Sequence, residues 1–352
     1  MKRILYFIKK YCYNGEDSET GRKSFHFPPQ IAPKRHTMYY IIVNPASKSG
    51  RGRKIWKELE QIFLARNIAY KVIFSKGTGH VTRIVANLTA PDRQLPDASP
   101  VKLIILGGDG TVNEALQGIA DFDRLWLGYI PTGSSNDLAR DLALPKDPAH
   151  ILETILKGEV VRTLDLGILT YGKEQTSAVR YFAVSSGIGF DAAVCREALA
   201  SRFKKTLNKI GLGKLTYLSI ALKQLAAAKS VSCDIYLDHS ETPIRLKRFL
   251  FTAFMVHKYE GGGFQFCPTA DASDGLLDLC VVGRIPKLVI LFALPTAFWG
   301  KHYIFPAIRH FTAEKATLCS SAPLWVHTDG EVTRKSDSIT IACLKQKLHL
   351  MM

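Results

Sequence analysis

The segment Val101–Glu114 reads VKLIILGGDGTVNE and sets the interpretation of the whole chain. Its apolar run predicts a buried strand, and apolar residues then return at helical spacing at Ala115, Leu116 and Ile119. The glycines between the two accept positive φ and let the backbone approach a bulky ligand closely. The free N–H groups at the start of a helix attract anions. The segment therefore predicts a strand–turn–helix unit that binds phosphate groups.

One carboxylate lies inside this turn. Asp109 would repel phosphate unless a divalent cation lay between them, so the turn predicts a site for nucleotide phosphates and Mg²⁺. The lysine of a Walker loop is missing, which excludes a standard P-loop. A glycine turn between a strand and a helix is also a common plain connection, so this turn alone does not decide the function.

The composition indicates two domains and an acidic partner. The chain has 352 residues, 47% of them hydrophobic, which suffices for two packed cores. Its net charge of +16, from 47 Lys and Arg against 31 Asp and Glu, favours nucleic acid, an anionic bilayer or a polyphosphate as partner. Because the sequence contains no helix-turn-helix, zinc-finger or RNP-type motif, we favour the anionic membrane surface over nucleic acid.

Cysteine usage and hydropathy favour a cytoplasmic protein. The seven cysteines are scattered and never form CxxC, which is typical of a reducing compartment. The apolar segment 4–8 is too short for a signal-peptide core, and the longest apolar stretch, 288–299, is shorter than a bilayer span. We expect a protein that associates peripherally with the inner face of the membrane.

The N-terminal third alternates between strand and helix patterns. We expect residues 1–37, which carry eight Lys and Arg, to be a disordered basic extension, because their five consecutive apolar residues would hold a membrane only weakly. Strand patterns and helix patterns then alternate up to residue 130. The strands are predicted at 39–43, 69–74, 101–106 and 127–130, and the helices at 54–66, 80–88 and from Thr111. Such repeats predict a parallel sheet covered by helices, with ligands at the carboxyl ends of its strands.

After Asp165 the pattern changes to short β-rich runs separated by turn residues, which predicts an antiparallel sandwich. A basic amphipathic segment at 191–229 interrupts the runs. It fits an anionic lipid surface, and it fits equally a helix that packs on its own domain. We expect a nucleotide-binding domain at 38–165, a substrate domain at 166–335, and a C-terminal segment at 336–352 that returns to the first domain.

Seven motifs in order resemble the diacylglycerol kinase catalytic-domain family, and in particular its soluble bacterial lipid kinases. They are NPASKSGRG (44–52), GGDGTVNE (107–114), PTGSSNDLAR (131–140), SSGIGFDA (185–192), GGGFQFCPTADASDGLLDL (261–279), GKH (300–302) and HTDGEV (327–332). NAD kinases share the GGDGT turn but not the later segments. The resemblance implies a Rossmann-like α/β domain followed by an antiparallel β-sandwich.

The resemblance also implies a nucleotide site. Its residues in this sequence would be Asn44, Pro45, Ala46, Ser47, Ser49, Gly50, Ser75, Gly107, Gly108, Asp109, Gly110, Thr111, Val112, Asn113 and Ser134. Lys48 departs from the family pattern, because a glycine usually stands at this position of the first loop. If the position needs positive φ, lysine strains the turn. Alternatively, its ammonium group adds a contact to phosphate.

A metal site and a general base follow from the same resemblance. Asp271 and Asp274 match metal ligands, with the carbonyl of Leu276 as a third, and this oxygen set suits Mg²⁺. Asp165 is expected to brace this site. Glu331 matches the general base, and Asp109 would hold metal from the facing domain. Without the resemblance, the two segments would be interpreted as an Asp-rich turn and a hairpin.

These features predict a kinase that uses ATP and Mg²⁺ to phosphorylate the hydroxyl of a lipid at an anionic membrane surface. Diacylglycerol, which would give phosphatidic acid, is the favoured acceptor. Sphingoid bases, undecaprenol and phosphatidylglycerol stay open as acceptors, and so does a homodimer. An NAD kinase and a non-catalytic lipid- or nucleotide-binding regulator are the alternatives outside this class.

Overall fold

The computed structural model describes residues 38–48, 50–92, 100–158, 161–172, 178–200, 220, 223–225, 227, 231–283 and 285–352. Residues 38–352 form one compact unit. The basic extension predicted for residues 1–37 and most of the amphipathic segment beyond Ala200 lie outside the described residues. Among the described residues, no helix is long and apolar enough to cross a membrane.

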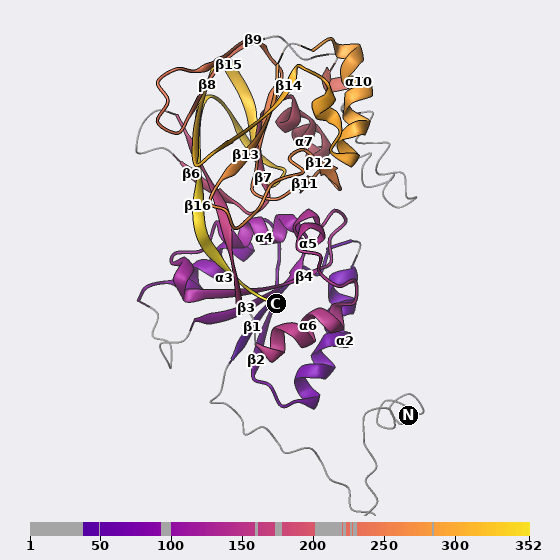
Figure 1. Cartoon of the computed structure of the whole chain (residues 1–352). Helices are drawn as coiled ribbons and strands as arrows, with labels where there is room; N and C mark the ends of the chain where they lie inside the picture. Colours follow the sequence, from indigo (N-terminus) through magenta and orange to yellow (C-terminus); the bar gives the residue numbers. More distant parts are fainter. Residues whose placement is uncertain are drawn as a thin grey trace, which may run out of the picture. The chain divides into compact units, whose positions relative to one another are not determined.

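A parallel sheet forms the core of the first domain (Figure 1). Its strands are β1 (Tyr39–Val43), β2 (Tyr70–Phe74), β3 (Val101–Gly107) and β4 (Leu125–Pro131), in the order β4-β3-β1-β2. The helices between and after them are α2 (Arg51–Ala65), α3 (His80–Thr89), α4 (Asp109–Leu116), the short η1 (Phe122–Arg124), α5 (Asp137–Asp141) and α6 (Pro148–Lys157). The predicted parallel sheet is therefore confirmed.

Strand β3 explains why its sequence is apolar without alternation. Leu103 and Ile105 point into a cluster that contains residues of α3 and α4. Ile104 and Leu106 point into a second cluster with residues of α2 and α6. Because helices cover both faces of the sheet, every position of the strand except the half-buried Lys102 is buried, as is usual for parallel sheets.

An antiparallel region follows, in the order β14-β13-β10-β7-β15-β16. Its elements are β5 (Val161–Tyr171), β6 (Val179–Phe182), β7 (Ser185–Gly189), α7 (Phe190–Ala200), β8 (Val231–Leu237), β9 (Ile244–Phe249), β10 (Phe251–Met255), β11 (Tyr259–Glu260), β12 (Phe264–Gln265), β13 (Leu277–Val282), α10 (Lys287–Thr296), η2 (Ala297–Trp299), η3 (His302–Ile304), β14 (Ile308–Ala313), β15 (Lys315–Thr328) and β16 (Glu331–Met351). The predicted fold class, an α/β domain followed by an antiparallel β-sandwich, is confirmed.

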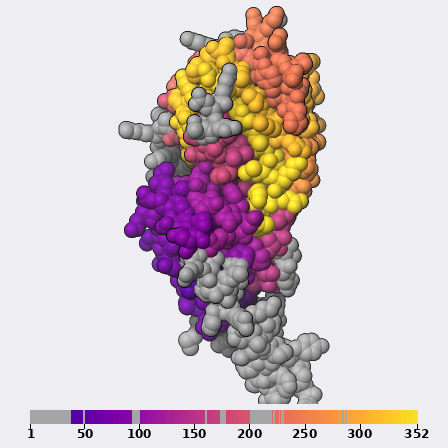
Figure 2. Space-filling view, turned by 90° about the vertical axis from the view of Figure 1, so that its left-hand side faces the viewer, coloured from indigo at the N-terminus to yellow at the C-terminus, as the bar shows by residue number. Residues whose placement is uncertain are grey.

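The last strand joins the two regions. β16 pairs antiparallel with β15 and β5, and its residues His349 and Leu350 pair in parallel with β4. In the space-filling view the yellow C-terminal residues lie against the purple residues of the first domain (Figure 2). The strand bends at an irregularity between Leu344 and Leu348, where the carboxylate of Asp165 accepts a hydrogen bond of 2.7 Å from the N–H of Gln346.

Candidate active site

One cavity of about 710 Å³ lies at the carboxyl ends of the four parallel strands. Parallel α/β sheets bind ligands at this edge. Its lining includes one segment after each strand, in order 44–48, 75–78, 108–111 and 133–137.

Contacts between these segments fix the cavity wall. The side-chain amide of Asn44 donates a hydrogen bond of 3.1 Å to the hydroxyl of Thr111. The segments after β3 and β4 touch through two glycines. A Cβ on Gly133 would lie 2.6 Å from the Cα of Gly108, a distance that real Cβ atoms do not show, so the close approach requires glycine.

Asp109 begins helix α4 and lines the cavity. The N–H of Asp137 donates a hydrogen bond of 2.9 Å to its carboxylate, and the hydroxyl of Tyr129 lies 3.3 Å from it. Burial is the largest cause that raises the pKa of Asp109, to about 7, and the carboxylate of Asp137 raises it further. Burial also raises the pKa of Asp137. Two carboxylates held together away from water favour either a proton or a cation.

Asp329 fixes the turn between β15 and β16. Its carboxylate accepts hydrogen bonds of 2.8–3.0 Å from the backbone N–H groups of Ala183, Val184 and Ser185. It also accepts one of 2.9 Å from the side-chain amide of Asn113 in α4. The turn that carries Glu331 is therefore held against the helix that carries Asp109.

Glu331, the predicted base, lines the same cavity at the start of β16. A Cβ built on Gly110 would lie 3.3 Å from one of its carboxylate oxygens. Its carboxylate thus lies directly beside the glycine turn, within reach of an acceptor group that approached the phosphates.

A buried polar cluster beside the cavity was missed from sequence. Nε2 of His327 lies 2.7 Å from the carboxylate of Asp191 and 3.3 Å from that of Glu260. Burial, followed by the charge of Asp191, raises the pKa of Glu260 to about 8. For His327, burial acts to lower the pKa, and the neighbouring carboxylates of Asp191 and Glu260 act to raise it.

Together with Cys195, these side chains offer four potential metal-ligand atoms within 4.8 Å of one another. However, the N–H of Gly330 donates a hydrogen bond of 3.1 Å to Nδ1 of His327. The Nδ1 lone pair is therefore occupied, so the ring proton is on Nε2, the nitrogen that a metal would need. The cluster is a hydrogen-bonded network that supports the turn of Asp329 and Glu331.

Another part of the cavity wall is apolar. It is formed by Val81 of α3, Val184, and Ala198 and Leu199 of α7. The cavity thus brings backbone N–H groups and hydroxyls suited to phosphates together with a surface suited to an apolar ligand.

Most of the predicted nucleotide residues line this cavity. They are Asn44, Pro45, Ala46, Ser47, Ser75, Gly108, Asp109, Gly110, Thr111 and Ser134, and Lys48 joins them. Four other predicted residues do not line the cavity. Gly50 caps α2, Gly107 ends β3, and Val112 and Asn113 are buried behind the glycine turn. Ser49 lies outside the described residues.

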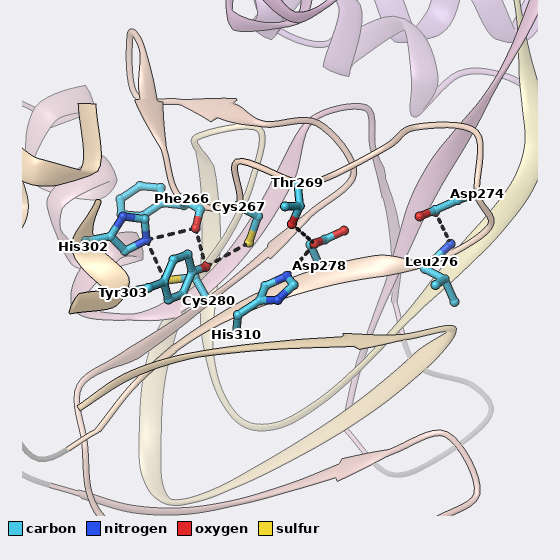
Figure 3. Close-up of polar contacts among 10 residues, drawn as sticks. All are labelled: Phe266, Cys267, Thr269, Asp274, Leu276, Asp278, Cys280, His302, Tyr303 and His310. Atoms are coloured by element: carbon cyan, nitrogen blue, oxygen red, sulfur yellow. Dashed lines mark hydrogen bonds and ion pairs between the residues drawn. The ribbon is translucent and has the colours of Figure 1, made fainter. Parts of the chain in front are cut away.

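The predicted metal residues lie elsewhere. Asp271 and Asp274 are exposed on the turn before β13 and do not line the cavity. Figure 3 shows the carboxylate of Asp274 accepting a hydrogen bond of 2.9 Å from the N–H of Leu276. The carboxylate of Asp165 accepts one of 2.7 Å from the N–H of Gly275, so Asp165 does brace this turn.

Comparison with known proteins gives the family. Residues 38–168 match the diacylglycerol kinase catalytic domain, and residues 183–352 match the YegS C-terminal NAD kinase beta sandwich-like domain. A diacylglycerol kinase of Mycobacterium tuberculosis is 31% identical over 231 residues, which are 65% of this chain and 70% of the relative. A diacylglycerol kinase of Bacillus subtilis is 26% identical over 294 residues, which are 83% of this chain and 88% of the relative.

A solved structure agrees in fold. The crystal structure of a diacylglycerol kinase from Bacillus anthracis has a TM-score of 0.62 at 19% sequence identity, over 90% of this chain and 96% of that chain. An α/β domain with glycine turns at its strand ends, joined to a β-sandwich, defines the class of diacylglycerol kinase-like and NAD kinase-like proteins. Within this class, the chain belongs to the diacylglycerol kinase catalytic-domain family, as its motifs indicated.

Proposed function

We propose that this protein is a Mg²⁺-dependent lipid kinase that transfers the γ-phosphate of ATP to a lipid hydroxyl, most directly that of diacylglycerol. One observation carries the proposal: a single cavity holds the glycine turn with Asp109, the carboxylate of Glu331 and an apolar wall from α7. Phosphoryl transfer to an alcohol needs these three features, namely positioned phosphates, a proton acceptor and a seat for the acceptor molecule.

The nucleotide would lie across the four strand ends. Hydroxyl and amide groups of Asn44, Ser47, Ser75, Thr111 and Ser134 line this wall and can donate to phosphate or ribose oxygens. The N-terminus of α4 adds the backbone N–H groups of a helix start, which favour anions.

Asp109 is the residue that fits Mg²⁺. It is a cavity-lining carboxylate whose raised pKa reflects burial and the neighbouring Asp137, and a divalent cation would relieve both effects. A bound Mg²⁺ would neutralise charge on the β- and γ-phosphate oxygens. We keep the second metal position, at Asp271, Asp274 and the Leu276 carbonyl, as a separate proposal, because these residues lie outside the cavity.

Glu331 would accept the proton of the lipid hydroxyl. Its position is held by Asp329, which binds three backbone N–H groups and Asn113. A general base must lie within hydrogen-bond distance of the proton that it accepts. A turn that fixes the position of Glu331 therefore contributes to the rate.

Diacylglycerol is favoured over the other lipid alcohols because the two relatives reported above are named diacylglycerol kinases. The net charge of +16 supports action at an anionic membrane, and we propose peripheral association with its inner face. A sphingoid base, undecaprenol or phosphatidylglycerol as the acceptor would give a different labelled product.

The test is a panel of these lipid alcohols, with NAD as a further acceptor, incubated with γ-labelled ATP and Mg²⁺ and separated by thin-layer chromatography. We expect label in phosphatidic acid and none with Asp109→Asn. Glu314→Gln, which removes an exposed carboxylate outside the cavity, is the matched control and should retain activity. Label in another lipid would reassign the acceptor, and label in NAD alone would reject a lipid kinase.

A further inference from the structure

An exposed apolar surface covers α10, η2 and η3 on the second domain. Among the described residues, nine large apolar side chains are exposed, and five of them lie between positions 288 and 304. They are Leu288, Leu291, Phe292, Trp299 and Ile304, with exposures of 67%, 37%, 66%, 69% and 71%. Single exposed apolar side chains are ordinary on a protein surface, but a concentrated patch indicates a binding surface.

Helix α10 is apolar on both of its faces. Ile290 and Ala293 are buried in a cluster with Phe251 and Phe266, which fixes the inner face. Leu288, Phe292 and their neighbours form the outer face at helical spacing. A water-exposed helix normally has polar residues on its outer face, and an apolar outer face indicates contact with another apolar phase.

In the segment that follows α10, polar side chains point inward and apolar side chains point outward. His302 and Tyr303 point inward and donate hydrogen bonds of 3.1 and 2.6 Å to the carbonyl of Phe266 (Figure 3). Trp299 and Ile304, on either side of them, are exposed to water. The polar side chains thus fix the loop from inside, and the apolar ones are presented outward by a positioned backbone.

Charge decides between a bilayer and a second copy of this chain. The sequence from 279 to 313 contains no Asp or Glu, and its described cations Lys301 and Arg309 are exposed. A symmetric dimer through this surface would bring these cations against their own copies, which costs free energy. Anionic headgroups complement them, and tryptophan at a surface of this kind favours the membrane interface.

The surface is connected to the cavity through α7. Phe190, at the start of α7, belongs to the same core cluster as Ile290 and Ala293 of α10. Ala198 and Leu199, near its end, line the cavity. α7 therefore packs against α10 at its start and forms part of the apolar cavity wall near its end. Docking through α10 would bring membrane lipid close to this helix.

We propose that the exposed apolar surface of α10, η2 and η3 enters the interfacial layer of an anionic bilayer and docks the protein on its substrate membrane. The docking role rests on the proposed lipid kinase function, but binding itself can be measured without ATP. In this geometry the apolar side chains lie among the acyl chains and the flanking cations lie at the headgroups.

The first experiment uses the full chain and vesicles of phosphatidylcholine with and without phosphatidylglycerol. The double variant Leu288→Glu with Phe292→Glu should bind anionic vesicles roughly a hundredfold more weakly, since about tenfold is expected for each large apolar side chain that enters lipid. Leu64→Glu, at a site on α2 that is 59% exposed, is the matched control and should bind like the unaltered protein. Lys301→Glu should weaken binding by about tenfold on anionic vesicles and little on neutral ones.

The second experiment follows the fluorescence of Trp299. Emission from Trp299 should shift to shorter wavelength on anionic vesicles and be quenched by brominated acyl chains, and Trp299→Phe should remove the shift while binding persists. The Leu288→Glu, Phe292→Glu variant should keep its activity on short-chain diacylglycerol in detergent. Vesicle binding that is unchanged in this variant, or a protein dimer that the variant dissolves, would overturn the proposal.

Discussion

The side-chain amide of Asn113 donates a hydrogen bond of 2.9 Å to the carboxylate of Asp329, across 216 positions of the sequence. It joins the helix that begins with Asp109 to the turn that carries Glu331. The proposed metal ligand and the proposed base therefore belong to one hydrogen-bonded assembly, although they come from different domains. Such support is what holds reacting groups at a fixed separation.

Asp329→Asn should lower both stability and turnover. An amide offers one acceptor oxygen, and its NH₂ group would face backbone N–H donors that the carboxylate now satisfies. Since hydrogen bonds to charged groups contribute about 1.5–3 kcal/mol each, we expect a loss of about 2–4 kcal/mol in the free energy of unfolding. Urea unfolding measures it. Asp337→Asn, an exposed site on β16, should be neutral, and equal stability of the two variants would remove Asp329 from this role.

Glu331→Gln should separate chemistry from binding. Glutamine keeps the shape of the side chain but cannot take a proton from the lipid hydroxyl. Turnover should fall by about 10²–10⁴-fold, while ATP affinity and melting temperature stay nearly unchanged. Isothermal titration with ATP and a thermal scan accompany the kinetics. Loss of ATP binding would place Glu331 in the nucleotide site instead of at the acceptor.

Activity should depend on pH through Asp109. Burial and Asp137 raise its pKa to about 7, and metal binding needs the ionised form. At limiting Mg²⁺ the rate should therefore rise as pH increases through about 7, and excess Mg²⁺ should move the midpoint to lower pH. A midpoint that does not respond to Mg²⁺ would separate this titration from metal binding.

The same shift predicts a stability effect without metal. The pKa of Asp109 in the folded protein lies above the ordinary value of 3.8. At pH below 3.8 the carboxyl is protonated in both the folded and the unfolded protein, and its contribution to stability is complete. As pH rises through about 7 the buried carboxyl has to ionise, and this stability is lost. Asp109→Asn should consequently raise the melting temperature at pH about 8 and change it little at pH about 4. A thermal scan at both pH values, without Mg²⁺, measures this, and a lower melting temperature at pH about 8 would contradict it.

Lys48 combines backbone strain with a position on the cavity wall. The φ of Lys48 is 42°, in the left-handed region that glycine favours, and Lys48 lines the cavity. Lys48→Gly should relieve strain of about 1 kcal/mol and raise the melting temperature, but it should also raise KM for ATP by up to about fivefold. Lys48→Asn, which tolerates positive φ without charge, should share the KM effect. Unchanged KM in both variants would leave strain as the whole effect.

The strand ends could be predicted because local pattern determines them. Apolar runs that stop at Asn44, Ser75 and Gly107 locate the carboxyl ends of parallel strands, and parallel topology brings these ends together. The same reasoning missed β14 and α6, although α6 has a local start signal in the Asp147 cap followed by Pro148. Helix α10 was visible only as an apolar stretch, because exposure is not encoded in composition.

The polar networks could not be predicted, because they depend on how distant segments approach. His327 meets Asp191 across 136 positions, and no spacing rule connects them. Asp329 was noticed only as a neighbour of Glu331, yet its side chain fixes the turn. From the sequence, strain at Lys48 and an added contact to phosphate were alternatives. The positive φ of Lys48 shows that the backbone there has the conformation that glycine favours.

The most direct measurement of the central claim is the transfer of label from γ-labelled ATP to chloroform-extractable lipid, with diacylglycerol as acceptor and with or without Mg²⁺. The proposed function predicts labelled phosphatidic acid with the unaltered protein and Mg²⁺. It predicts label at least about 10²-fold lower with Glu331→Gln, and none with Asp109→Asn or without metal. Absence of label in every lipid tested, from a folded protein that binds ATP, would contradict it, and so would equal labelling by Glu331→Gln.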